Sequence, residues 1–182
     1  MKKILVPIDF SEHSEYALET AATIAKKHGS EIFVLHMLEL SNAIYTASSD
    51  SLTEEAVFYL KLAEKKMHTF LDRNFLEGIA VTPIVKHFKV FKEINDVIDA
   101  HDINLVVMGS HGASGVKEVI VGSNAEKVVR YAEVPVLIVK HNPILLEFDT
   151  AIFASDFSED AIQSYLRAKK TFKKLTNSQV IS

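Results

Sequence analysis

The sequence of 182 residues contains no cysteine. This absence excludes disulfide bonds, thiol catalysis and cysteine-based metal sites, and it is typical of proteins in a reducing compartment. No apolar run approaches the length of a membrane-spanning helix, and Pro7 and Asp9 interrupt the one near the N-terminus. The net charge is −4 and the basic residues are dispersed, so neither nucleic acid nor a membrane is indicated as a partner. We therefore expect a cytoplasmic protein.

Two catalytic or metal-binding patterns are also missing. No G-x-x-x-x-G-K-[ST] sequence occurs, so the lysine and hydroxyl that position γ-phosphate and Mg²⁺ in P-loop enzymes are absent. The 8 histidines show no H-x-x-x-H or H-E-x-x-H spacing, which argues against a metal site built by the protein. His111 could act as a general base, but a solvent-facing loop side chain explains it equally well. We assign no catalytic residue.

Apolar and amphipathic segments alternate along the first 140 residues. The apolar segments are typical of buried strands, and they cover Lys3 to Asp9, Glu31 to Met37, Ile79 to Val85, Asn104 to Met108 and Val134 to Val139. Segments with helical spacing separate them, and Ser11 and Gly29 are typical of the ends of the first helix. The alternation predicts an α/β fold with an open parallel five-stranded sheet, order 3-2-1-4-5, and helices on both faces. Pro83 favours an edge position for the third strand.

A glycine-rich stretch, Met108 to Asn124, follows the fourth strand. Gly109, Gly112 and Gly122 could permit positive φ angles in turns, or let backbone N–H groups approach an anion. Ser123 begins an S-x-x-E pattern typical of a capping box, which would direct the free amides of the next helix toward the glycines. The stretch therefore predicts an anion site, with a flexible surface loop as the alternative.

The predicted strand order adds a second observation. In such sheets, ligands bind outside the carboxyl ends of the strands where the order switches, here strands 1 and 4. Asp9 closes strand 1 and Gly109 follows strand 4. Asp9 could also be an ordinary loop acid or a helix N-cap. The convergence of both residues at one place favours a ligand site.

The spacing G-x2-G-x9-G-S, together with VPIDFSEHS near the N-terminus and VPVLIVK near residue 140, resembles the ATP-binding branch of the universal stress protein family. The resemblance covers one whole family domain, residues 1–141, and implies an adenine-nucleotide α-hydrolase-like fold. It implies that the Asp9 carboxylate accepts from the adenine amino group. Ala125 departs from the pattern, because family members that bind ATP often carry a hydroxyl residue there.

The same resemblance implies the other residues of the site. It implies a base pocket and a phosphate site formed by Pro7, Ile8, Asp9, Met37, Met108, Gly109, His111, Gly112, Gly122, Ser123 and Asn124. Mg²⁺ or Mn²⁺ would arrive with the ATP phosphates rather than on protein ligands. Because the P-loop residues are missing, we expect a nucleotide-dependent sensor or regulator with slow or no hydrolysis. The alternatives are an interaction domain that binds no nucleotide, and an ATP-cleaving transferase, for which no acceptor-substrate site is visible.

The family resemblance also implies a homodimer through the last strand, Val134 to Lys140. A second route to association lies in residues 142–182, which repeat the start of the chain. The sequence Asp-Phe-Ser-Glu occurs at Asp9 to Glu12 and again at Asp156 to Glu159. We expect a strand, a helix from about Glu159 to Leu175 and the start of another strand. This piece is predicted to be a truncated second repeat that packs on the first domain or exchanges between chains, with a natural interaction arm as the alternative.

Overall fold

The computed structural model describes residues 2–38, 54–87, 94–110, 123–141 and 152–175. A parallel five-stranded sheet in the order β3-β2-β1-β4-β5 forms its centre, as predicted from the sequence. The strands and helices, in chain order, are β1 (Lys3–Ile8), α1 (Glu12–His28), β2 (Glu31–Leu38), α3 (Glu54–Leu71), the 3-10 turn η1 (Asn74–Leu76), β3 (Val81–His87), α4 (Ile94–Ala100), β4 (Leu105–Gly109), α5 (Ser123–Tyr131), β5 (Val136–Val139) and α6 (Glu159–Leu175).

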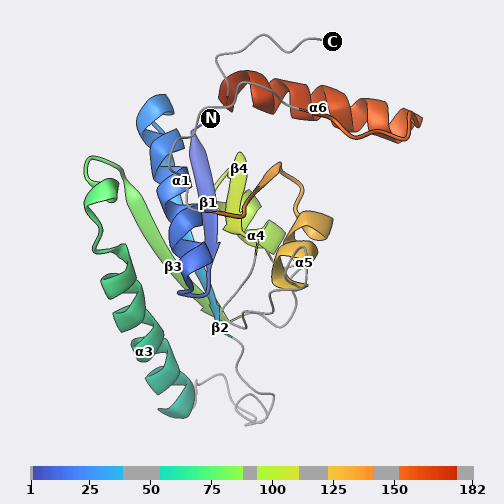
Figure 1. Cartoon of the computed structure of the whole chain (residues 1–182). Helices are drawn as coiled ribbons and strands as arrows, with labels where there is room; N and C mark the ends of the chain where they lie inside the picture. Colours follow the sequence, from blue (N-terminus) through green and yellow to red (C-terminus); the bar gives the residue numbers. More distant parts are fainter. Residues whose placement is uncertain (1, 39–53, 88–93, 111–122, 142–151, 176–182) are drawn as a thin grey trace.

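The central strands are buried on both faces, which is why their sequences are almost continuously apolar. Side chains alternate across the sheet, so Ile4 and Val6 of β1 contribute to one core while Leu5 contributes to the other. The first core lies under α1 and includes α3 residues such as Met67. The second includes Val97 of α4 and lies under α4 and α5. Figure 1 shows the sheet with α1 and α3 together and with α4 and α5 apart from them.

The ends of α1 follow from local sequence. Ser11 has extended backbone angles and its side chain accepts a hydrogen bond from the N–H of Ser14, which makes it the N-cap. Gly29 adopts the left-handed conformation at the other end, with φ 62°. Both sequence predictions for this helix are confirmed. Its position is important because α1 begins three residues after Asp9.

Pro83 explains how the outer edge of β3 is protected. The N–H of Ile32 donates to the carbonyl of Ala80 across the β2–β3 ladder. Since alternate residues of a strand direct their polar backbone groups to the same side, Pro83 lies at a position whose N–H would point away from β2. Proline removes that donor from the open edge, as predicted for an edge strand.

The helix α6 lies apart from the sheet and its covering helices (Figure 1). Its bounds, Glu159–Leu175, agree with the helix predicted from the internal repeat. Residues 152–158, where the repeat predicts a strand, form no strand within the described part of the chain. In the first copy, the corresponding strand is held between β2 and β4. The second copy has no such neighbours among the described residues, so residues 152–158 run beside α6 instead (Figure 1).

Candidate functional site

Asp9 lies directly beyond the end of β1 and is held in one orientation by the following turn. Its Oδ1 accepts hydrogen bonds from the N–H of Ser11 at 3.1 Å and from the hydroxyl of Ser14 at 2.6 Å. The N–H of Asp9 donates to the same Ser14 hydroxyl at 3.0 Å. Ser14 is buried, at 4% exposure. This network anchors a half-buried carboxylate at the end of the sheet where α1 begins.

The next residue, Phe10, turns back over the end of β2. It has φ 64°, an unusual value for a residue with a side chain. Its ring lies 4.3 Å from the ring of His36 and 5.7 Å from that of Phe70, measured between centroids. The positive φ therefore directs an aromatic ring into the gap between β2 and α3, while Asp9 remains at the strand end.

His36 is a site residue that the sequence interpretation missed. Its Nδ1 lies 3.1 Å from the carbonyl oxygen of Ile8, and the two residues are partners in the β1–β2 register. Burial lowers the pKa of His36, against the opposing effects of the Ile8 carbonyl and the Asp9 carboxylate. A neutral imidazole therefore lies beside the Asp9 turn. The pairing of residue 8 with residue 36 belongs to the β1–β2 register, which the apolar pattern of the two strands does not fix to one residue.

Gly109 has a structural role that differs from either role considered for the glycines. A Cβ at this position would lie 2.7 Å from the carbonyl oxygen of His13 and 2.8 Å from the His13 Cβ. Glycine is therefore needed where the first turn of α1 packs against the end of β4. This close packing holds the Asp9 turn beside the end of β4, at the junction predicted from the strand order.

The remaining predicted residues divide between the two faces of the sheet. Pro7, Ile8 and Met108 are buried, and Met37 is half-buried at the end of β2. Met108 and Met37 belong to the core under α4 and α5, whereas Ile8 belongs to the core under α1. The strand ends thus place apolar side chains on both sides of the Asp9 turn.

The structure describes only the two ends of the glycine-rich stretch that is predicted to hold the phosphates. Gly109 lies at the end of β4, and Ser123 and Asn124 begin α5. Asn124 is exposed. Ala125, the departure from the family pattern, is 3% exposed and packs in the core with Met108 and Val128. The predictions for His111, Gly112 and Gly122 lie outside the described residues.

The described residues contain neither a metal-binding cluster nor a helix able to span a membrane. In the described ranges, no group of three or more histidine or acidic side chains is arranged to hold a metal ion. Among the helices of the described chain, none combines the length and apolar character needed to cross a membrane.

Comparison with known proteins agrees with this architecture. The model of the universal stress protein family matches residues 1–140. The universal stress protein MJ0531 of Methanocaldococcus jannaschii is 31% identical over 153 residues, and the match covers 76% of this chain and 82% of that protein. The solved structure of MJ0577 from the same organism has a TM-score of 0.64 and 29% identity, covering 77% of this chain and 96% of that one.

A further solved structure is a universal stress protein from Archaeoglobus fulgidus in complex with dAMP. It is 22% identical, has a TM-score of 0.55, and the match covers 77% of this chain and 98% of that one. At this identity the likeness concerns the fold alone. The family match over residues 1–140, the MJ0531 relative and the strand order agree with one another. This chain belongs to the universal stress protein family.

Proposed function

We propose that residues 1–140 bind an adenine nucleotide, ATP, at the carboxyl ends of β1 and β4. The observation that carries this proposal is the anchored carboxylate of Asp9 at the point where the strand order switches. In this proposal, Asp9 accepts from the adenine amino group, and the backbone around Pro7, Ile8 and Met37 lines the base. The complex of an Archaeoglobus fulgidus relative with dAMP supports an adenine nucleotide as the ligand class.

The phosphates would lie toward Gly109, Gly112, Gly122, Ser123 and Asn124, near the beginning of α5. A helix N-terminus offers backbone N–H groups and a favourable dipole to an anion. Mg²⁺ or Mn²⁺ would be coordinated mainly by phosphate and water. Because the sequence has no P-loop lysine, we propose a cytoplasmic sensor or regulator that hydrolyses ATP slowly or not at all.

The sharpest test replaces Asp9 while keeping its turn. Asp9→Asn retains an oxygen that can accept from Ser11 and Ser14, but it presents an amide N–H₂ group in place of the second carboxylate oxygen. That group repels the adenine amino group and is compatible with the carbonyl of guanine. Titration calorimetry should therefore show ATP affinity falling by about tenfold or more, while GTP affinity stays level or rises.

Asp156→Asn is the matched control, because Asp156 accepts from the N–H of Ser158 at 3.0 Å in a turn of the same design. It should leave ATP affinity unchanged. A wild-type protein that binds no ATP, ADP or AMP at millimolar concentration would exclude the proposal. Binding that Asp9→Asn leaves unaltered would exclude the assigned adenine site.

A second function, a protein-interaction domain, is favoured by the exposed apolar side chains beyond residue 150. Ile152 and Phe157 are 90% and 88% exposed. The two partner surfaces predicted from the sequence are the edge strand β5 within Val134 to Lys140, and the partial repeat exchanged between chains. β5 is an edge strand of the sheet. Sedimentation velocity tests this function, because a monomer at high concentration contradicts both surfaces.

A further inference from the structure

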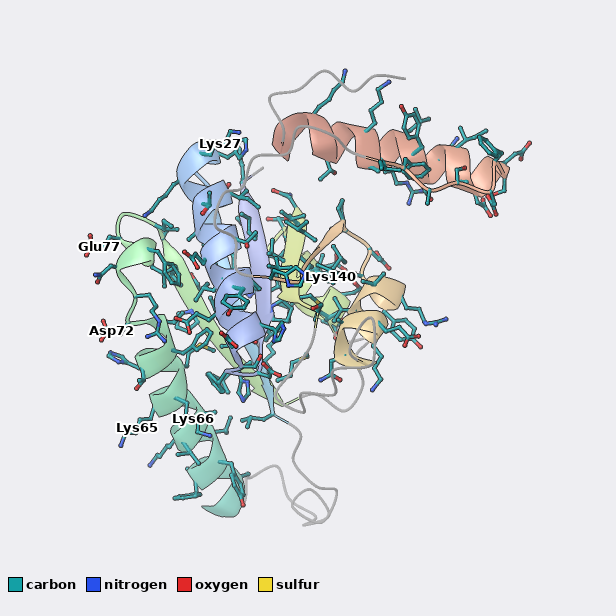
Figure 2. All side chains as sticks on the ribbon, viewed as in Figure 1. Lys27, Lys65, Lys66, Asp72, Glu77 and Lys140 are labelled. Carbon is teal, nitrogen blue, oxygen red and sulfur yellow. The ribbon has the colours of Figure 1, made fainter. Side chains whose placement is uncertain are left out.

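One face of α3 is apolar near its start and basic farther along. Phe58 and Leu62 are 62% and 40% exposed, and Tyr59 beside them is 39% exposed. Lys65 and Lys66 follow, and both project from α3 (Figure 2). Because residues three, four and seven apart share a helix face, Phe58, Leu62 and Lys65 form one stripe. An exposed apolar stripe of this kind indicates a contact surface.

The stripe leads into a groove of about 430 Å³ between α3 and the turn after β1. Its apolar wall includes the rings of Phe10 and Phe70, and its rim is basic. The lining residues are Phe10, Leu62, Lys65, Lys66, Thr69, Phe70 and Arg73. Arg73 is already paired with Glu15 at 2.7 Å, so the two lysines supply the positive charge toward solvent. An aromatic ring flanked by acids is the ligand that suits this groove.

The chain carries a segment with the opposite arrangement. Phe157 is 88% exposed and lies between Asp156 and the acidic first turn of α6, which contains Glu159 and Asp160. Ile162 and Leu166 of α6 are 52% and 53% exposed. Glu159, Ile162 and Leu166 share one helix face, because they are three and four residues apart. Asp160 lies about 100° around the helix from Glu159, outside this face.

The two stripes match when the helices run antiparallel. The spacing of Leu166, Ile162 and Glu159 is four residues and then three, which is also the spacing of Phe58, Leu62 and Lys65. Setting Leu166 beside Phe58 therefore sets Ile162 beside Leu62 and Glu159 beside Lys65. The same register brings Phe157 to the groove, because Phe157 precedes Glu159 by two residues and the groove continues past Lys65 along α3 as far as Arg73.

We propose that α6 of one chain docks on α3 of a second copy, with Phe157 in the groove beside Phe10 and Phe70. The two helices of one chain lie at opposite sides of the molecule, so α6 can reach a neighbour's α3 without crossing its own fold (Figure 1). A two-fold arrangement lets each copy donate one α6 and accept another, which closes the assembly as a dimer. The proposal does not depend on nucleotide binding.

The absence of native cysteine permits a direct test. Leu62→Cys and Ile162→Cys are prepared as separate full-length variants, mixed, and oxidised. A disulfide-linked pair containing one chain of each variant is expected, since the two positions oppose each other only between copies. Replacing the first partner with Val129→Cys, an exposed position on α5, should give no such pair. Failure of the first mixture to cross-link would overturn the proposal, as would an intrachain disulfide in a monomeric Leu62→Cys/Ile162→Cys double variant.

Charge reversal tests the register without cysteines. Lys65→Glu or Glu159→Lys alone should weaken dimerisation about tenfold in sedimentation velocity, because each places like charges together twice in a two-fold dimer. The double variant Lys65→Glu/Glu159→Lys should recover most of the wild-type affinity. Unchanged association in both single variants would overturn this register. Circular dichroism of each variant checks that the total helical content is retained, and calorimetry with ATP reports separately on the nucleotide proposal.

Discussion

Gly109→Ala is a test of whether this glycine is required by packing or only by a ligand. In the folded chain, the added Cβ would lie 2.7 Å from the carbonyl oxygen of His13 and 2.8 Å from two further His13 atoms. Ordinary contact begins at about 3.4 Å, so the first turn of α1 must move away from β4 by roughly 0.7 Å. The nearest atom belongs to the backbone, so no side-chain rotation relieves the overlap.

The cost of that movement can be bounded. Overpacking a well-packed core typically costs about 1–3 kcal/mol, and β4 is buried along its whole length. Alanine also lowers the conformational entropy of the unfolded chain, and this stabilises the folded state by about 0.4–1 kcal/mol. We therefore expect Gly109→Ala to lower the free energy of unfolding by about 1–2 kcal/mol. For a chain of this size, the melting temperature should fall by about 3–6 °C.

The measurement is urea or thermal unfolding of nucleotide-free protein, since the two explanations then predict opposite signs. A glycine needed only for a ligand gains stability from alanine, whereas a glycine needed for packing loses it. Gly29→Ala is the control, because Gly29 has φ 62° with no atom within 4 Å of an added Cβ. It should lose about 1 kcal/mol through backbone strain alone. An unchanged or higher stability of Gly109→Ala would refute the packing explanation.

Two further perturbations test the anchored turn and its neighbours. Because burial lowers the pKa of His36, the unfolded chain binds a proton below about pH 6.5 before the folded chain does, so stability should fall as pH drops through that region. His36→Asn keeps an N–H near the Ile8 carbonyl, and its urea-unfolding free energy should decline less between pH 7 and pH 5; an equal decline would assign the effect to other groups. Ser11→Ala removes the cap of α1 and should cost about 1 kcal/mol in global unfolding. Ser158→Ala removes the corresponding cap of α6, which accepts from the N–H of Ala161, and should reduce helicity without changing the global unfolding transition. If Ser158→Ala lowers the free energy of global unfolding as much as Ser11→Ala does, α6 unfolds together with the sheet.

The fold was predictable because its determinants are repeated at many positions. Five apolar segments, each separated by helical spacing, leave few alternatives to a parallel sheet, and errors in single strand ends do not alter the order. The third strand illustrates this: it was expected at Ile79 to Val85 and is found at Val81–His87. Pro83 remains within it and still indicates the edge.

The details of the site were less predictable because they depend on contacts between distant elements. The contact that requires glycine at position 109 is made by His13, which lies on another element and is revealed only when α1 packs against β4. His36 depends on the register between β1 and β2, which an apolar pattern does not specify to one residue. Ala125 departs from the family pattern by lacking a hydroxyl group, and only the packed structure shows that its side chain contributes to the core under α4 and α5.

The two Asp-Phe-Ser-Glu turns separate what local sequence determines from what tertiary contacts determine. Phe10 and Phe157 have φ angles of 64° and 61°, and in both turns the aspartate accepts from the serine two residues later. Each serine then accepts from the N–H three residues beyond it, and a helix follows. The turn, the cap and the unusual φ are thus encoded within a few residues. Burial is not, because Phe10 packs against His36 and Phe70 whereas Phe157 is exposed. A turn that already directs its phenylalanine outward needs only an aromatic groove to bury it, and α3 borders one.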